Sequence, residues 1–157
     1  MEFPGVTKSG RSQAPGRRPR LFTLEHANRT LPLVRRIVAD VIVRYKKICA
    51  LEERCQGPIP DGADAAIDEL RRQYGVELDA LRQLADELSA VGCDLKDVRR
   101  GIVDFRALHG GRIIELCWRH GEESLQFWHE FNDGFHDRRK IDDQFCGELI
   151  TPSAATV

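Results

Sequence analysis

Three runs within residues 101–141 alternate apolar and polar side chains, and this alternation constrains the fold more than any other feature of the chain. The runs span residues 103–106, 113–118 and 125–131. Because successive residues of a β-strand point to opposite faces, each run predicts a strand with an apolar face and a mixed face. A three-stranded antiparallel sheet of this kind needs a second layer to cover its apolar face.

The segment that joins the second and third runs predicts a hairpin turn. Residues 119–122 read Arg-His-Gly-Glu, and Gly121 accepts a positive φ without steric cost. A loop with an even number of residues places both apolar sets on one face, whereas an odd number would mix them. We expect the even loop, which puts His129 on the apolar face and Trp128 on the mixed face.

The covering layer is predicted by two long helical patterns. Thr23 is expected to cap a short helix that ends near Arg29, and Pro32 suits the first turn of a new helix. That second helix should end near Cys55, before a break at residues 56–62 that is rich in Gly and Pro. The apolar positions recur at steps of three and four residues, first Val34, Val38, Val41, Tyr45, Ile48 and Leu51, then Ile67, Leu70, Tyr74, Leu78, Leu81, Leu84, Leu88 and Val91.

The predicted fold class is therefore α+β. An antiparallel hairpin of long helices, at about residues 24–91, should pack on a small three-stranded antiparallel sheet within the strand-rich motif at about 101–141. With 157 residues the chain is expected to form one domain, at residues 21–150. Residues 151–157 are expected to form a loose tail.

The N-terminal 20 residues differ from the rest in charge and apolar content. They carry five basic side chains and one acid, so the remaining chain has a net charge of −5 within the total of −1. Such a segment buries too little apolar surface to offset its ordering entropy, and we expect a disordered basic arm. An acidic body argues against a nucleic-acid-binding face on the folded domain.

The cysteine pattern and the apolar runs indicate the compartment. The five cysteines are odd in number and include no CxxC pair, which favours reduced thiols in a cytoplasmic protein. No run approaches the roughly 18 apolar residues of a membrane span, and the N-terminus has no secretory signal. We therefore expect a cytoplasmic chain with no membrane contact.

The sequence offers no catalytic signature, so whether the chain is an enzyme stays open. Phosphate-binding glycine loops, HExxH and GxSxG are all absent. His129 is the most informative single residue, because a buried imidazole needs a hydrogen-bond partner or a metal. We favour a core histidine that bonds one backbone or carboxylate group over a ligand to a divalent metal.

If His129 does hold a metal, its carboxylate partners must come from elsewhere. Glu122 would lie roughly 23 Å away along an extended strand, at about 3.3 Å per residue. Glu25, near the start of the helical unit, is the better candidate for a second ligand. Arg138 and Glu122 are further candidates for ligand binding, since an arginine at that place could clamp a carboxylate or phosphate or form an ordinary ion pair.

Trp128 is the candidate for a contact surface. An exposed indole on the mixed face of a sheet often marks such a surface, although a crossing segment within residues 132–150 would cover it.

A set of short motifs resembles the bacterial family called domain of unknown function 2203. The resemblance covers about residues 21–141, and His26 departs from it at a position where the family has an acid. It implies a helical unit followed by a strand-rich C-terminal motif, and no reaction or ligand. The motifs are Phe22-Thr23-Leu24-Glu25, Ala27-Asn28, Lys96-Asp97, Gly101, Val103-Asp104-Phe105, Leu116-Cys117-Trp118-Arg119, Gly121-Glu122, Phe127-Trp128-His129, Gly134-Phe135 and Arg138.

Two functions fit these observations. The first, which we favour, is a small binding or interaction protein, with a possible homodimer through the helices or the Trp128 face. The second is a metal- or small-acid-binding protein, with or without enzyme activity, whose site is built around His129.

Overall fold

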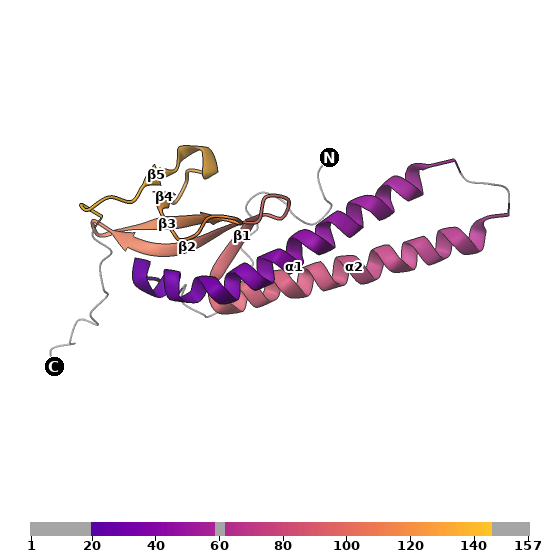
Figure 1. Ribbon diagram of the computed structural model, residues 1–157, viewed down its shortest axis with the longest axis horizontal. Coiled ribbons are helices and arrows are strands. Elements are labelled where there is room, and N and C mark those ends of the chain that lie inside the picture. Colours follow the sequence, from indigo (N-terminus) through magenta and orange to yellow (C-terminus); the bar gives the residue numbers. More distant parts are fainter. Residues whose placement is uncertain (1–19, 59–61, 146–157) are drawn as a thin grey trace.

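The computed structural model describes residues 20–58 and 62–145. The expected basic arm, apart from Arg20, and the expected C-terminal tail lie outside these ranges. Two helices precede the strands along the chain (Figure 1). The elements are α1 (Leu24–Gln56), α2 (Asp64–Val91), β1 (Cys93–Asp97), β2 (Ile102–His109), β3 (Arg112–Arg119), β4 (Phe127–Glu130), the 3-10 helix η1 (Phe135–Asp137) and β5 (Arg139–Lys140).

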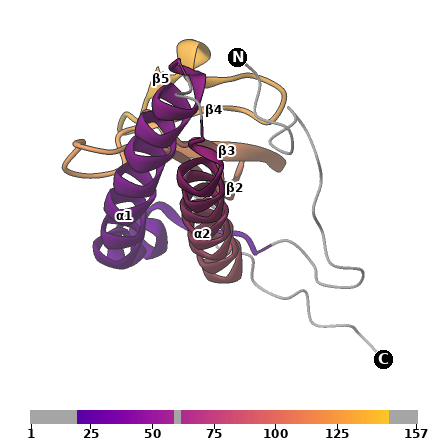
Figure 2. The ribbon, with the colours of Figure 1, turned by 90° about the vertical axis from the view of Figure 1, so that its right-hand side faces the viewer.

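The two helices form the predicted antiparallel hairpin. Figure 2, turned to look along the hairpin, shows α1 and α2 side by side. Thr23 caps α1, because its hydroxyl oxygen accepts a hydrogen bond from the His26 N–H at 3.1 Å. Gly92 ends α2 with a φ of 106°, and its N–H bonds back to the carbonyls of Leu88 and Ser89.

The predicted break between a short and a long helix is wrong. Pro32 lies inside α1, which runs without interruption for 33 residues. A proline inside a helix removes one backbone hydrogen bond and costs about 3 kcal/mol. Ala27, Leu31 and Val34 are buried on both sides of it, and burying these side chains offsets the cost.

The sheet has five strands, not the three that the sequence predicted. Neighbours in the chain are neighbours in the sheet, in the order β1-β2-β3-β4-β5, and each pair is antiparallel. The three predicted strands correspond to β2, β3 and β4. The two that were missed are the edges: β1 reads Cys-Asp-Leu-Lys-Asp, which is poor in strand-forming residues, and β5 has only two residues.

The predicted register of β4 is also wrong, and the error exchanges the two faces of the strand. Trp128 lies opposite Leu116, and His129 lies opposite Glu115. The loop between β3 and β4 therefore holds an odd number of residues. An odd loop places each side chain of the following strand on the opposite face from the one that an even loop gives. Trp128 thus shares the face of Leu116, and His129 lies on the other face.

The core lies between the helices and one face of the sheet, which we call the inner face. Trp118 and Leu116 of β3 pack there with Phe105 of β2 against Val34 and Leu88 of the helices. Figure 1 shows the helices on this side, with η1 and β5 on the opposite side of β2 and β3. That opposite side, the outer face, carries His129. A second, smaller core between the helices includes Ile48 and Leu81, and Leu95 and Val98 pack against it. Figure 1 shows the hairpin extending beyond the sheet.

Gly101 is the tightest point at which the sheet meets the helix. It has a φ of 63°, and an added Cβ would lie 2.7 Å from Val38 Cγ1 and 2.8 Å from His120 Cβ. We expect Gly101→Ala to lower the free energy of unfolding by about 2 kcal/mol or more, because backbone strain and a core clash add. Urea denaturation measures this loss.

Gly111 provides the matched control. Its φ is 74°, but nothing lies within 4 Å of an added Cβ. Gly111→Ala should therefore cost only the backbone strain, about 1 kcal/mol. Equal losses for the two variants would contradict the close approach of α1 to the β1–β2 turn.

Candidate functional site

A row of buried polar side chains crosses the outer face of the sheet. Asp104 of β2, Glu115 and Cys117 of β3, and His129 of β4 are each exposed by 3% or less. The strand register assembles them, because Asp104 pairs with Cys117 and Glu115 pairs with His129. We call these four residues the polar row. Such groups are costly to bury unless they are paired, so their contacts decide what the row can do.

The His129 ring is held at both of its nitrogens. Nδ1 lies 2.8 Å from the Glu130 carbonyl oxygen, and Nε2 lies 3.2 Å from Asp104 Oδ2. The expectation of a buried, hydrogen-bonded histidine is confirmed, although on the outer rather than the apolar face. A carbonyl oxygen and a carboxylate both accept, so two hydrogen bonds require a proton on each nitrogen.

Lys96 of β1 lies close to both carboxylates of the polar row. Its Nζ lies 3.2 Å from Glu115 Oε1 and 3.9 Å from Asp104 Oδ2. Two acids, the lysine and a doubly protonated His129 give a network without net charge. This balance explains how so many ionisable groups are buried together.

Cys117 completes a set of three ligand-type side chains. One ligand atom each from Asp104, Cys117 and His129 lie within 4.8 Å of one another. Asp104 Oδ1 is buried and has no hydrogen-bond partner among the described residues. Burying a carboxylate oxygen without a hydrogen-bond partner is unfavourable. Asp104 Oδ1 is therefore the atom of the polar row that would gain most from a new partner.

The protonation of the row follows from burial and from its charges. Burial lowers the pKa of His129, but Asp104, the Glu130 carbonyl and Glu115 outweigh it, so the pKa is raised overall. Burial, and then the nearby Asp104 carboxylate, raise the pKa of the Cys117 thiol. Burial and Asp104 also raise the pKa of Glu115, which Lys96 opposes. A thiol with a raised pKa is a poor nucleophile, which argues against a catalytic cysteine.

Arg138 and Glu122, both predicted as ligand-binding residues, bind each other. Arg138 Nη1 donates to Glu122 Oε1 at 2.8 Å, and both side chains are more than four-fifths buried. The other oxygen of Glu122 accepts from the Arg119 N–H at 2.9 Å. The Arg138 guanidinium also lies 4.4 Å from the centre of the Phe127 ring, and Phe127 is the neighbour of Cys117 in β4. The pair therefore borders the polar row at its Cys117 end.

The structure does not bring Glu25 to His129. Glu25 lies in the first turn of α1 with an exposed side chain, and it pairs with Arg29 on the same helix. His129 lies on the face of the sheet that is turned away from that helix. The carboxylates beside the imidazole are instead those of Asp104 and Glu115.

The interpretation of Trp128 as an exposed contact residue is wrong. Its side chain is 8% exposed and belongs to the core. The ring packs beside His109 and Phe145, with the Arg139 guanidinium 5.0 Å from its centre. The expected homodimer therefore loses its support at this face and stays a prediction for the helices alone.

Sequence reasoning missed Asp104 and Lys96 as site residues. Asp104 stands between the apolar Val103 and Phe105, and an acid at that place of a buried strand is a signal that could have found it. Lys96 lies on β1, an edge strand that was not predicted. Cys117 and Glu115 fell on the correct strand, but the register error placed His129 on the other face.

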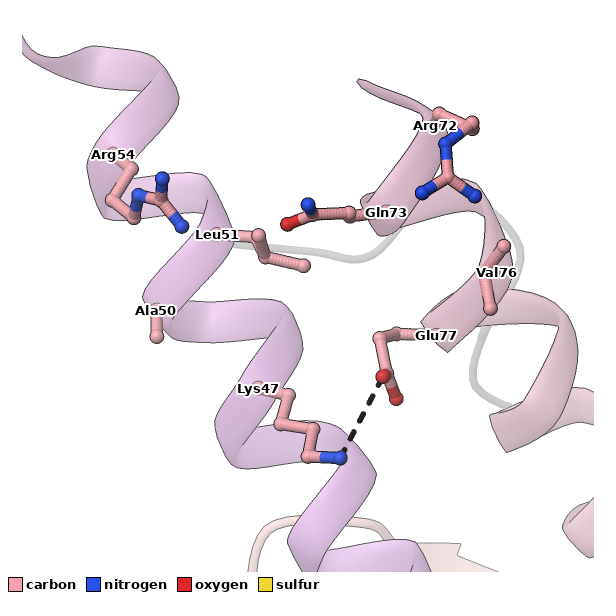
Figure 3. A pocket seen from close by; sticks show the side chains of 8 residues that line it. All are labelled: Lys47, Ala50, Leu51, Arg54, Arg72, Gln73, Val76 and Glu77. Carbon is pink, nitrogen blue, oxygen red and sulfur yellow. Dashed lines mark ion pairs between the residues drawn. The ribbon is translucent and has the colours of Figure 1, made fainter. Parts of the chain in front are cut away.

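A second feature, on the distal hairpin, is a groove between α1 and α2 (Figure 3). It has a volume of about 360 Å³. Lys47 of α1 and Glu77 of α2 face each other across it at 3.7 Å, and Val76 beside them is 54% exposed. The residues that line it are Lys47, Ala50, Leu51, Arg54, Arg72, Gln73, Val76 and Glu77.

The chain belongs to the family of uncharacterised conserved proteins called domain of unknown function 2203 (DUF2203), which matches residues 20–141. The resemblance carried by the short motifs is thereby confirmed. No curated protein and no solved structure is significantly similar to the chain. Within the described ranges, neither helix is apolar enough along its length to cross a membrane.

Proposed function

We propose that this chain binds one divalent metal ion through Asp104, Cys117 and His129. The observation that carries the proposal is their convergence, with ligand atoms within 4.8 Å of one another in a buried face where one carboxylate oxygen lacks a partner. A cation that Asp104 bound through Oδ1 would give that oxygen its missing partner. No contact with Glu25 is required.

The ligand set favours zinc or a similar borderline metal over magnesium or calcium. One imidazole, one thiolate and one carboxylate match zinc, whereas magnesium and calcium prefer oxygen ligands alone. Zinc bonds of about 2.0–2.3 Å require ligand atoms roughly 3.5 Å apart, so the side chains must close slightly on the ion. Glu115 Oε2, 3.9 Å from His129 Nδ1, is the nearest further carboxylate to the imidazole.

The hydrogen bond at Nδ1 supports His129 as a ligand. A metal-binding histidine usually donates its other ring N–H to a carbonyl or carboxylate, which fixes the tautomer and the orientation of the ring. Here the Glu130 carbonyl lies 2.8 Å from Nδ1, and Nε2 faces Asp104. The ring is therefore oriented before any ion binds.

The charge of the row is the same with and without the ion. Binding a divalent cation would displace one proton from Nε2 of His129 and one from the Cys117 thiol. Two protons leave and two positive charges enter, so Lys96 and Glu115 keep their pairing at 3.2 Å. This exchange adds no uncompensated charge to a buried face.

The burial of the ligands favours a structural ion over a catalytic one. A catalytic metal keeps an open coordination position for substrate, whereas structural sites are closed by protein ligands. Three protein ligands leave one position of a tetrahedral ion to a further ligand, but all three are exposed by 3% or less, so that position lies in a buried face away from bulk solvent. We therefore assign the ion a role in holding β2, β3 and β4 together, and no reaction.

Titration of the metal-free full-length protein with Co²⁺ and Zn²⁺ tests this proposal. We expect one ion per chain and a thiolate-to-cobalt charge-transfer band. Asp104→Asn, Cys117→Ser and His129→Ala should each weaken binding by about 100-fold or more, since even residues behind the ligands contribute 10–100-fold. Zn²⁺ should also raise the melting temperature of the wild-type protein, because it binds the folded state.

Cys93→Ser is the matched control for Cys117→Ser. Cys93 is also a buried thiol, but it bonds to the Leu88 carbonyl in the core on the inner face. Its replacement should leave the affinity and the charge-transfer band unchanged. The absence of stoichiometric binding, or equal binding by folded Cys117→Ser protein, would refute the site and leave the row as an ion-pair network.

A second candidate function is protein interaction through the distal hairpin, with a second copy of this chain as the partner. It is supported by the groove, which combines the exposed Val76 with charged residues on both helices, namely Lys47 and Arg54 on α1 and Arg72 and Glu77 on α2. A twofold axis through this region would bring Val76 of one copy near Val76 of the other and surround the apolar contact with the charged residues of the groove.

Sedimentation equilibrium of the full-length protein tests this candidate. We expect a concentration-dependent dimer that Val76→Asp dissociates, because a carboxylate in an apolar contact is costly. Leu33→Asp is the control, since Leu33 is similarly exposed on α1 but does not line the groove. A monomer at every concentration, or equal effects of the two variants, would count against the dimer.

A further inference from the structure

Three arginines surround one phenylalanine at the end of the sheet that bears the β1–β2 turn. The guanidinium carbons of Arg138, Arg100 and Arg119 lie 3.7, 4.8 and 5.7 Å from the centre of the Phe135 ring. We call these three side chains the arginine cluster. Guanidinium groups stack on aromatic rings, so the ring holds them in defined orientations.

The cluster is assembled by the fold from separate segments. Arg100 lies in the β1–β2 turn, Arg119 ends β3, and Arg138 follows η1. The first two segments are joined by the hydrogen bond from the His120 N–H to the Gly101 carbonyl at 2.9 Å. Segments far apart in sequence therefore bring three positive charges to one ring, where like charges repel unless something compensates them.

The protein itself compensates two of the three charges. Arg100 Nε donates to Asp97 Oδ2 at 2.8 Å, and Arg138 Nη1 donates to Glu122 Oε1 at 2.8 Å. The Arg119 guanidinium has no carboxylate partner anywhere in the described part of the chain. The cluster thus keeps one positive charge without a counter-ion.

The cluster also keeps unused hydrogen-bond donors. A guanidinium has five N–H groups, and Arg100 uses only its Nε–H on Asp97. Its terminal nitrogens and the whole Arg119 guanidinium are left to bind an external acceptor. Arg100 is 42% exposed, so solvent and small solutes reach it.

We propose that the arginine cluster binds a small phosphate-bearing anion, with Arg100 and Arg119 as the residues that contact it. A tetrahedral phosphate offers several oxygens to donors that arrive from different segments, whereas a carboxylate has two coplanar oxygens and is served by a single guanidinium. All three guanidiniums lie around one ring, which suits one phosphate group and not the extended track of a nucleic acid. None of the three arginines is a ligand of the proposed metal site.

Inorganic phosphate is the probe, titrated into the full-length protein at constant ionic strength. The arginine Nε–H resonances of Arg100 and Arg119 report contact directly by NMR. We expect both to shift in a saturable way with a dissociation constant on the order of 1 mM, as suits a ligand of few atoms. Acetate at the same concentrations should cause smaller, non-saturating shifts.

Arg119→Gln should weaken phosphate binding about tenfold, because it removes the uncompensated charge and its charge-assisted hydrogen bonds. The matched control is Arg71→Gln, which removes an exposed guanidinium that pairs with Asp68 on α2. This control should bind phosphate like the wild-type protein.

Three results would overturn the proposal. One is the absence of saturable shifts at Arg100 and Arg119, and another is equal phosphate affinity of the wild-type protein and the Arg119→Gln variant. The third is a single-stranded oligonucleotide that binds far more tightly than phosphate and is displaced only by salt, which would reassign the cluster to nucleic acid. Loss of metal binding in a Cys117→Ser protein leaves the prediction for phosphate unchanged, so the two proposals fail separately.

Discussion

The structure depends on a sheet that is buried on both faces. Along β3, Leu116 and Trp118 turn inward to the helices, while Glu115 and Cys117 turn outward, and all four are almost inaccessible to solvent. The inner face is stabilised by burial of apolar area, which needs no partner. The outer face holds ionisable groups, and burying these is favourable only where each finds a countercharge or a hydrogen bond. The sheet therefore combines an ordinary core with a face whose stability depends on charge pairing.

That constraint connects the fold to its candidate chemistry. A histidine held between a carbonyl and a carboxylate needs either a second proton or a cation at Nε2. The Cys117 thiol and the Asp104 carboxylate each bring a ligand atom within 4.8 Å of a nitrogen of that ring, and Asp104 Oδ1 has no partner among the described residues. Under the metal-binding proposal, the same geometry would hold two protons or one divalent ion without a change of net charge. The arginine cluster, which borders the Cys117 end of the row through Arg138, is a separate excess of positive charge that the protein leaves open to solvent.

The sequence predicted the features that depend on local periodicity, and it failed where distant segments decide the outcome. The helical repeats predicted the hairpin, Gly92 predicted the end of α2, and the strand alternation predicted β2, β3 and β4. The continuity of α1 through Pro32 depends on packing against the sheet, which no local rule contains. The face of His129 depends on the length of one loop, and a single residue there reverses it. Asp104 became a site residue only through its pairing with Cys117 across two strands.

The most direct test of the account is the X-ray absorption fine structure of zinc bound to the full-length protein at one ion per chain. Zinc bound by Asp104, Cys117 and His129 should give a single shell with one sulfur at about 2.3 Å and nitrogen and oxygen neighbours at about 2.0 Å, including the outer-ring scattering of an imidazole. A shell of light atoms alone, with no sulfur, would show that zinc binds elsewhere. It would contradict the claim that the outer face of the sheet assembles a metal site.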